Sequence, residues 1–270
     1  MKKYVVLFSF FFLMLACKTN PFTGKSTLNF HPNSQVFPMA FEQYNQFLSE
    51  NKVVTGTEAA ASVERVGKRI AAASERWLNA NGYEGYLNDY RWEYKLVKDE
   101  AVNAWCMPGG KIVVYTGILP IAQDDAGLAV VMGHEVAHAL VDHGAQRLSA
   151  ATFQQGGAIV GNILLSDNPE SQQLFNQVYA VGSNVGVMLP FSRAHENEAD
   201  KIGLIIMALA GYNPDEAAKL WERMKANSGG GAPPEFLSTH PSNDTRIKNL
   251  RELAPVAKQE AAKFGVTSFK

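Results

Sequence analysis

The chain has little cysteine and almost no net charge. Cysteine occurs only at Cys17 and Cys106, too few for a fold held together by disulfides. The 25 Lys and Arg residues nearly cancel the 26 Asp and Glu residues, which leaves a net charge of −1. The basic residues form no dense cluster, so nucleic-acid binding is excluded. Because 46% of the residues are hydrophobic, the chain can bury a substantial core.

The one long apolar run lies at the N-terminus, where two lysines precede apolar residues that end at Ala16. As a helix this run would reach about 20 Å, against roughly 30 Å of bilayer hydrocarbon. Residues 1–16 are therefore expected to be a secretion signal rather than a membrane span. The segment Leu13–Cys17 resembles the lipobox of bacterial lipoproteins, which implies a lipid anchor at Cys17 that attaches the chain to a membrane. An ordinary signal peptide with an incidental cysteine is the alternative.

With a lipid on Cys17, residues 17–38 are expected to be a tether, and residues 39–270 to be a folded domain. The proline and glycine content of the first segment is typical of a linker. Lys18 favours the outer membrane, by analogy with bacterial sorting rules. We therefore expect a location in the cell envelope, at the periplasmic face of the outer membrane. Cys106 then has no intramolecular partner, and no structural disulfide is expected.

The expected fold class is α+β, mainly α, with a small and mostly antiparallel sheet. Between Tyr90 and Leu119 the hydrophobic period changes to that of strands, and residues 102–107 are expected to add a strand at the sheet edge. An exposed edge beside a hydrolytic site would let an extended peptide bind as a further strand. Helices are predicted over residues 39–50, 57–81, 124 or 125 to at least 147, 192–211 and 214–227.

Residues 151–190 are apolar and rich in glycine. Polar residues interrupt every apolar run before it reaches the length of a membrane span. The sequence leaves three interpretations open for this segment: a lid, an interfacial hairpin or ordinary core.

The most informative stretch is His134–His138, which reads His-Glu-Val-Ala-His. Two histidines four residues apart share one face of a helix and can bind one zinc ion, with the glutamate between them as a base. A catalytic zinc takes three protein ligands and leaves one position open for water. Glu196 is the candidate third ligand, because Asp200 follows it by four residues and can orient a ligand histidine.

Three neighbouring polar residues are expected to have other roles. Glu198 lies two residues from Glu196 and should point elsewhere, as a solvated or structural carboxylate. His195 is expected at the surface or in packing. His143 lies five residues after His138, off the ligand face, and is expected to support the site or the core.

The His-Glu-x-x-His motif, joined to Glu196–Asp200, resembles metallopeptidase family 48, which includes the CAAX prenyl proteases. Further matches lie at Asn103-Ala104, Pro108-Gly109-Gly110, His143, Arg147, Ser192-Arg193, Ser238–Pro241 and Arg246. The resemblance covers roughly residues 90–250 and is strongest to the short, lipid-anchored periplasmic members, the LoiP type. It implies a gluzincin-like zinc metallopeptidase domain whose small sheet packs on the motif helix.

The resemblance also assigns roles to the matching residues. His134, His138 and Glu196 would bind one Zn²⁺ per chain. Glu135 would be the base that activates the zinc-bound water, and Asp200 would orient a ligand histidine.

Four further positions match residues at the family's active site or substrate strand. His240 would be either an inhibitory fourth zinc ligand or, like Arg246, a group that stabilises the oxyanion. Asn103 and Ala104 would bind the main chain of the substrate.

The function expected from these residues is a zinc-dependent endopeptidase of the bacterial cell envelope that cleaves unfolded or misassembled proteins. The alternative is a latent peptidase that acts mainly as a chaperone-like assembly factor for outer-membrane proteins. A purely structural zinc site is disfavoured, because such sites are usually rich in cysteine and Cys106 is the one spare thiol. An aminopeptidase stays open on the motif alone, and the sequence does not determine the oligomeric state.

Overall fold

The computed structural model describes residues 17–183, 188–227, 235–241 and 244–270. The predicted secretion signal, residues 1–16, lies outside the described residues. The chain divides into two compact units. The hairpin unit contains the described residues up to Val36 together with Val141–His195, and the core unit contains Phe37–Leu140 together with the described part of Glu196–Lys270.

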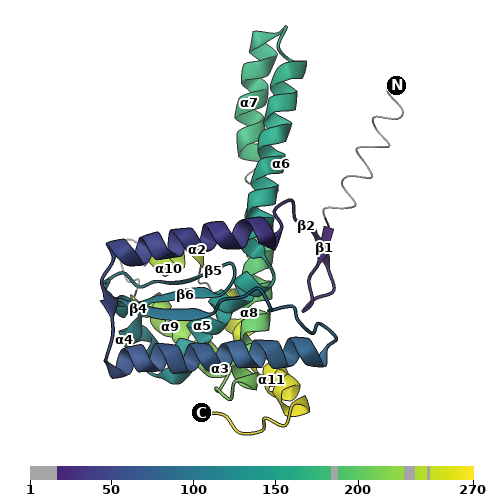
Figure 1. The fold of residues 1–270 in the computed structure, drawn as a ribbon. Coiled ribbons are helices and arrows are strands. Elements are labelled where there is room, and N and C mark those ends of the chain that lie inside the picture. Colours follow the sequence, from purple (N-terminus) through teal and green to yellow (C-terminus); the bar gives the residue numbers. More distant parts are fainter. Residues whose placement is uncertain (1–16, 184–187, 228–234, 242–243) are drawn as a thin grey trace. The chain divides into compact units, whose positions relative to one another are not determined.

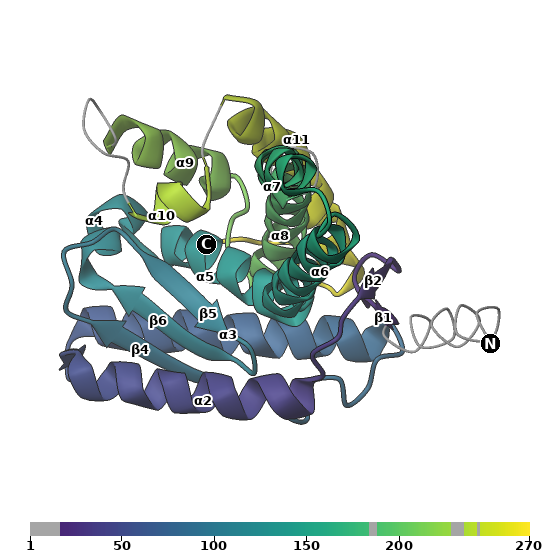
Figure 2. The same cartoon turned by 90° about the horizontal axis from the view of Figure 1, so that it is seen from above.

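The core unit is mainly helical and holds one small sheet (Figures 1 and 2). Its strands are β3 (Val53–Val54), β4 (Glu93–Val97), β5 (Ala104–Met107) and β6 (Lys111–Tyr115). Its helices are the greater part of α2 (Asn33–Glu50), α3 (Glu58–Ala80), the 3-10 turn η1 (Thr116–Ile118), α4 (Leu119–Ala122), α5 (Asp125–Leu140), most of α8 (Leu189–Leu209), α9 (Glu216–Asn227), α10 (Glu235–Thr239) and α11 (Asp244–Lys263). This composition confirms the expected fold class.

The sheet has the strand order β3-β4-β6-β5. β3 pairs with β4 and β5 with β6 in antiparallel fashion, whereas β4 and β6 are parallel. The sheet is thus mostly antiparallel, as predicted, and the predicted edge strand is β5. The parallel pair was not predicted. β6, whose run Ile112–Tyr115 is buried, lies beside β4 inside the sheet, and parallel pairs are usually covered on both faces.

Helices cover both faces of the sheet. On one face, Tyr44 of α2 packs in a buried cluster with Val97, Val113 and Tyr115. On the other face, α3 packs against β4 and α5 packs against both α3 and β5. Gly67 of α3 must lack a side chain, because a Cβ atom there would overlap the ring of Tyr94. The helix that carries the His-Glu-x-x-His motif therefore lies against the edge strand.

The first helix begins earlier than the predicted residue 39. α2 starts at Asn33 and contains Pro38, although a proline in a helix interior removes one hydrogen bond. Burial of Phe37, which is 4% exposed and lies 5.2 Å from the ring of Tyr90, anchors this turn. The predicted tether, residues 17–38, therefore contains regular structure.

The long helix predicted to reach Arg147 is in fact two helices. α5 ends at Leu140 and a new helix begins at His143, because Asp142 between them has a left-handed backbone with φ of 57°. The last carbonyls of a helix lack partners within it. Here the Tyr86 and Tyr90 hydroxyls donate hydrogen bonds to the carbonyls of Leu140 and Ala139, at 2.8 and 3.1 Å, which satisfies the end of α5.

The hairpin unit contains two short strands and two longer helices. Strands β1 (Cys17–Thr19) and β2 (Ser26–Leu28) are antiparallel. Helices α6 (His143–Leu164) and α7 (Pro169–Ser183) pack against each other as an antiparallel pair (Figure 1). In the described part of the chain, none of the helices is both long and apolar enough to cross a bilayer. Lipidation of Cys17 stays a prediction.

Candidate metal centre

The centre is built where helices α5 and α8 of the core unit cross. Gly133 and Gly203 face each other at this crossing: a Cβ atom added to Gly203 would lie 2.9 Å from the carbonyl carbon of Gly133. Side-chain-free positions allow two helix backbones to approach this closely. His134 follows directly on α5, and Glu196 and Asp200 lie on α8. The close crossing thus brings carboxylates of one helix to imidazoles of the other.

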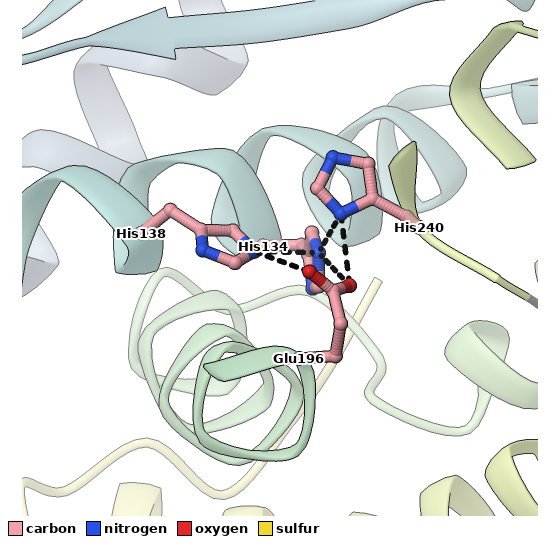
Figure 3. Close-up of side chains that lie close together, drawn as sticks. All are labelled: His134, His138, Glu196 and His240. Atoms are coloured by element: carbon pink, nitrogen blue, oxygen red, sulfur yellow. Dashed lines mark hydrogen bonds and ion pairs between the residues drawn. The ribbon is translucent and has the colours of Figure 1, made fainter. Parts of the chain in front are cut away.

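Four side chains converge at this point (Figure 3). Nε2 of His134 lies 3.1 Å from Nε2 of His138 and 3.3 Å from Oε2 of Glu196. Oε1 of Glu196 lies 3.3 Å from Nε2 of His138. His240, which directly follows α10, completes the group, with Nδ1 2.8 Å from Oε2 of Glu196 and 3.1 Å from Nε2 of His134. All four residues are buried.

Asp200 determines which nitrogen of His134 carries the proton. Its Oδ1 lies 3.0 Å from Nδ1 of His134, so that nitrogen donates to the carboxylate in the neutral ring. Nε2 then presents a lone pair to the group formed by His138, Glu196 and His240. Glu196 adds only acceptor oxygens, and a cluster of facing lone pairs without a cation is repulsive.

The arrangement fits a divalent metal ion. Ligand atoms about 2.1 Å from a tetrahedral zinc ion would be separated by roughly 3.4 Å. The four candidate ligand atoms all lie within 4.8 Å of one another, and their closest separations run from 2.8 to 3.3 Å. Imidazole nitrogens with one carboxylate oxygen form a ligand set that is typical of zinc hydrolases. His134, His138, Glu196 and His240 are therefore the residues that could hold the ion.

The ionisation of the group also suits a cation. Burial lowers the pKa of His134, but hydrogen bonds to Asp200 and Glu196 outweigh it and raise the pKa to about 9. Burial raises the pKa of Glu196, but hydrogen bonds with the three histidines hold that pKa far below its usual range. The site thus stabilises positive charge on an imidazole, and a bound metal ion would compete with that proton.

Arg246 supports the group from α11. Its Nε and Nη2 donate to both oxygens of Asp200, at 2.8 and 2.7 Å, and its Nη1 lies 3.3 Å from Oε2 of Glu196. The guanidinium carbon lies 3.7 Å from the centre of the Trp221 ring, a cation–π contact. Burial raises the pKa of Asp200, but the charge of Arg246 and the bond with His134 lower it on balance. Asp200 is thus held as a carboxylate.

Glu135 lies beside the cluster. It is 5% exposed, and its Oε1 lies 3.3 Å from Nε2 of His240. That oxygen forms no hydrogen bond within the described residues. A buried carboxylate oxygen whose one polar contact is this long retains the capacity to accept a proton from a water or substrate. This placement suits a group that accepts a proton at the centre.

Two predicted substrate residues lie on the sheet rather than in the cluster. Asn103 and Ala104 lie at the start of the edge strand β5, and Oδ1 of Asn103 accepts a hydrogen bond of 2.9 Å from the Ala104 amide. The preceding carbonyl, of Val102, accepts one of 3.1 Å from the Phe236 amide of α10. Strand β5 is thus tied to the helix that precedes His240.

His195, His143 and Glu198 lie in two settings. His195 is buried and stacks on His143 with ring centres 3.9 Å apart, so both are packing residues of the hairpin unit. Its Nε2 lies 3.1 Å from Oε1 of Gln146. Glu198 is partly exposed, which agrees with a solvated or structural carboxylate.

Sequence reasoning missed Gly133, Gly203 and Trp221. The signal for the glycines was their presence inside strongly helical segments, where glycine costs up to about 1 kcal/mol relative to alanine and usually has a packing reason. Trp221 gave no such signal, because an aromatic residue on the apolar face of a helix is typical of the hydrophobic core.

Replacing Gly203 with alanine should separate α5 from α8. The new Cβ would press on backbone atoms, which cannot move aside as a side chain can, so unfolding free energy should fall by about 1–3 kcal/mol. Metal affinity should fall with it. Urea denaturation and metal titration test this, with Gly144→Ala as the matched control, since a Cβ atom there meets nothing within 4 Å. Equal behaviour of the two variants would contradict the close-crossing argument.

Replacing Asp200 with asparagine should weaken metal binding by about 10–100-fold, because His134 loses the carboxylate that fixes its tautomer. Competition with a chelator of known affinity measures the change. Asp215→Asn is the control, since Asp215 forms an exposed ion pair of 2.6 Å with Lys258 and should leave metal affinity unaltered. An unaltered affinity in the Asp200 variant would show that orientation of His134 does not depend on this carboxylate.

Comparison with known proteins gives a consistent result. Residues 58–254 match Peptidase family M48. The chain is similar to the mitochondrial metalloendopeptidase OMA1 of Schizosaccharomyces pombe, with 35% identity over 223 residues, or 81% of this chain and 61% of the relative. It is also similar to OMA1 of Saccharomyces cerevisiae, with 38% identity over 64% of this chain and 50% of the relative. The beta-barrel assembly-enhancing protease of Yersinia pestis is 27% identical over 71% of this chain and 38% of its own length.

The comparisons correct the expected location. Relatives from two yeasts, Arabidopsis, cattle and human are named mitochondrial metalloendopeptidases, which contradicts the location predicted at the periplasmic face of a bacterial outer membrane. That expectation depended on the N-terminal segment, which lies outside the described residues up to Ala16. The chain spans about half the length of these relatives, from 36% to 61%. The match over most of the chain confirms the resemblance seen in the motifs: the chain belongs to peptidase family M48.

Proposed function

We propose that the chain is a zinc-dependent endopeptidase that cleaves unfolded or misassembled polypeptides. The observation that carries the proposal is the convergence of His134, His138 and Glu196 on one point, with the buried carboxylate of Glu135 beside it. The names of relatives as metalloendopeptidases support the activity. Cleavage inside a chain, rather than at its end, distinguishes this function from an aminopeptidase.

The three ligands would hold Zn²⁺, which would supply Lewis acidity and lower the pKa of a bound water to about 7. Glu135 would take a proton from the attacking water. It would then return the proton to the amine of the departing peptide, as a general base that becomes a general acid. Its burial at 5% exposure keeps bulk water from competing for that proton.

His240 is proposed as a fourth ligand in the arrangement observed. Nδ1 points at the cluster, 2.8 Å from Glu196 and 3.1 Å from His134, in the position that a water or substrate would need. A catalytic zinc site requires one open position. His240 would therefore have to leave before cleavage, and α10, which has only five residues (Glu235–Thr239), is the element that would carry it away.

Arg246 would act through its neighbours rather than on the substrate. It is 5% exposed and pairs with both oxygens of Asp200, so the guanidinium holds the carboxylate that orients His134. This differs from the expected role in stabilising the oxyanion. A positioning role predicts that its replacement weakens metal binding along with cleavage.

The substrate would add a strand at the free edge of β5. The Ala104 amide donates to its neighbour's side chain, Oδ1 of Asn103, at 2.9 Å rather than to β6. A substrate carbonyl could replace that acceptor and gain a main-chain hydrogen bond. Recognition of this kind uses the backbone of an extended peptide, which suits substrates that have lost their fold.

Glu135→Gln should retain the metal and abolish cleavage, because the amide cannot accept the proton. Glu196→Ala should lose both. Cleavage of casein by the metal-loaded chain, with metal content measured in parallel, tests both variants. Glu42→Gln, an exposed change on α2, is the control and should cleave at the normal rate. Normal cleavage by the Glu135 variant would rule out this mechanism.

His240→Ala should raise casein cleavage several-fold and lower metal affinity, because it removes a ligand that competes with water. The control is Ser238→Ala, an exposed position on the same short helix. A loss of about 10²–10³-fold would instead identify His240 as a stabiliser of the oxyanion. Retention of casein without cleavage, even by the His240 variant, would favour the assembly-factor function.

A further inference from the structure

The helix pair α6 and α7 carries most of the exposed apolar surface among the described residues. Large hydrophobic side chains are exposed there at Leu148, Phe153, Ile159, Val160, Ile163, Leu164, Leu174 and Val178. Elsewhere in the described chain, only Phe30, Met39 and Val256 are exposed in this way. Exposed apolar residues that gather on one element mark an interaction surface.

Most of these exposed side chains lie on α6. Phe153, Ile159, Val160, Ile163 and Leu164 recur at helical spacing, are between 55% and 78% exposed, and are called here the α6 apolar face. A helix of a water-soluble pair normally turns its apolar face toward its partner. On α6 the apolar face is turned outward.

The contact between α6 and α7 is correspondingly polar. Asn162 and Asn176 exchange two amide hydrogen bonds, of 2.8 and 2.9 Å. Nε2 of Gln172 donates to the Asn162 carbonyl at 3.0 Å, and the Tyr179 hydroxyl donates to the Gln154 carbonyl at 2.9 Å. Polar groups thus join the helices along the contact, together with the Phe175 ring, which packs on Gly161.

Two glycines make the close contact possible. A Cβ atom at Gly161 would overlap the Phe175 ring, and one at Gly157 would overlap the Tyr179 hydroxyl. Small residues and side-chain hydrogen bonds between helices, with apolar residues outside, are the packing rules of helices in lipid. The pair therefore has the polarity of a structure that is covered by hydrocarbon.

The charges of the segment indicate how it would lie. Residues 148–192 contain no Lys or Arg, and their only acidic residues are Asp167 and Glu170, at the turn between the helices and the start of α7. Gln173 and Gln177 of α7 are exposed. Charged and amide groups at the turn and on α7 exclude insertion end-on, because they would enter the hydrocarbon. They are compatible with a helix pair lying in the plane of the surface.

We propose that α6 lies in the plane of a lipid surface, with its apolar face at the boundary between headgroups and acyl chains. This does not require a helix that crosses the bilayer, and none of the described helices does so. Interfacial helices usually add basic residues that attract anionic lipids. The absence of Lys and Arg from residues 148–192 means that contact with hydrocarbon is the driving force, so neutral lipids suffice.

Tryptophan placed on the α6 apolar face tests the proposal in the full chain. Ile163→Trp is compared with Val256→Trp, a change at a 41% exposed position of α11, in phosphatidylcholine vesicles with brominated or unbrominated acyl chains. The chain already contains four tryptophans, so the emission of each added indole is taken as the difference between the variant and the unaltered chain. Bromine quenches only nearby indoles, so this difference should fall about twofold on bromination for the Ile163 variant, and should not change for the Val256 variant. Both variants carry the same N-terminal apolar run, so that run cannot produce the difference.

Absence of quenching in the Ile163 variant would overturn the proposal. A blue shift that appears without vesicles and rises with protein concentration would do the same, since it would assign the α6 apolar face to a second copy of the chain. Replacing a third of the phosphatidylcholine with phosphatidylglycerol should leave quenching unchanged. Binding that depends on this anionic lipid would contradict the inference about charge.

Hydrogen exchange of the unaltered chain provides a second measurement that needs no variant to fold. Neutral vesicles should slow exchange of the amides in residues 152–165 by at least about tenfold, because hydrocarbon contact stabilises the helix against local opening. Exchange in α11, residues 244–263, should not change. Equal exchange of residues 152–165 with and without vesicles would overturn the proposal. None of these measurements depends on peptidase activity.

Discussion

The close crossing of α5 and α8 is the constraint on which the rest of the core unit depends. Histidines four residues apart on one helix can share a cation with a carboxylate of another helix only if the two backbones are close. Gly133 and Gly203 provide that proximity, because neither has a Cβ atom to separate the helices. The sheet and α3 then hold α5 from the opposite side. Packing thus holds the candidate ligands of the two helices close together.

A second layer of contacts fixes the chemistry of those ligands. Asp200 sets the proton on His134, and Arg246 keeps Asp200 charged. Trp221 in turn lies against the Arg246 guanidinium, which lets a buried cation keep a favourable contact on its open face. Without this chain of partners, each charge would be costly in the interior. The buried ionic groups stabilise one another, and the site retains its geometry.

Sequence alone predicted the elements whose signals are local. The His-Glu-x-x-His spacing identified one helix face, the pair Glu196 and Asp200 identified another, and the change of hydrophobic period located the sheet. The fold brings these residues together, as the spacing suggested. Two features depend on non-local contacts and were not predicted: the parallel pairing of β4 with β6, and the helix break at Asp142. At that break, tyrosine hydroxyls far away in sequence donate to the last carbonyls of α5.

The polarity of residues 151–190 illustrates a different limit. Their composition was compatible with a lid, an interfacial hairpin or core, because composition does not say which face of a helix meets its partner. In the structure the amides of Asn162 and Asn176 join α6 to α7, while Ile159 and Ile163 are exposed. Hydrophobic periodicity identifies the apolar face of a helix, but it does not identify what that face contacts.

The exposed apolar face of α6 and the buried polar centre of the core unit occur in one chain. The position of the hairpin unit in the sequence explains how this is possible. Residues 141–195 lie between the end of α5, just after His138, and Glu196, so they form a loop between two ends that the core unit fixes. The entropic free-energy cost of closing a loop rises slowly, by about 0.6 kcal/mol for each doubling of loop length. A long insertion at this point therefore lowers the stability of the core unit only slightly, whether the surface of the insertion is polar or apolar. A metal ion bound by both His138 and Glu196 would join these two ends and stabilise the crossing further, because it binds only the folded arrangement. The α6 apolar face can therefore contact a surface of its own without altering the chemistry of His138 and Glu196.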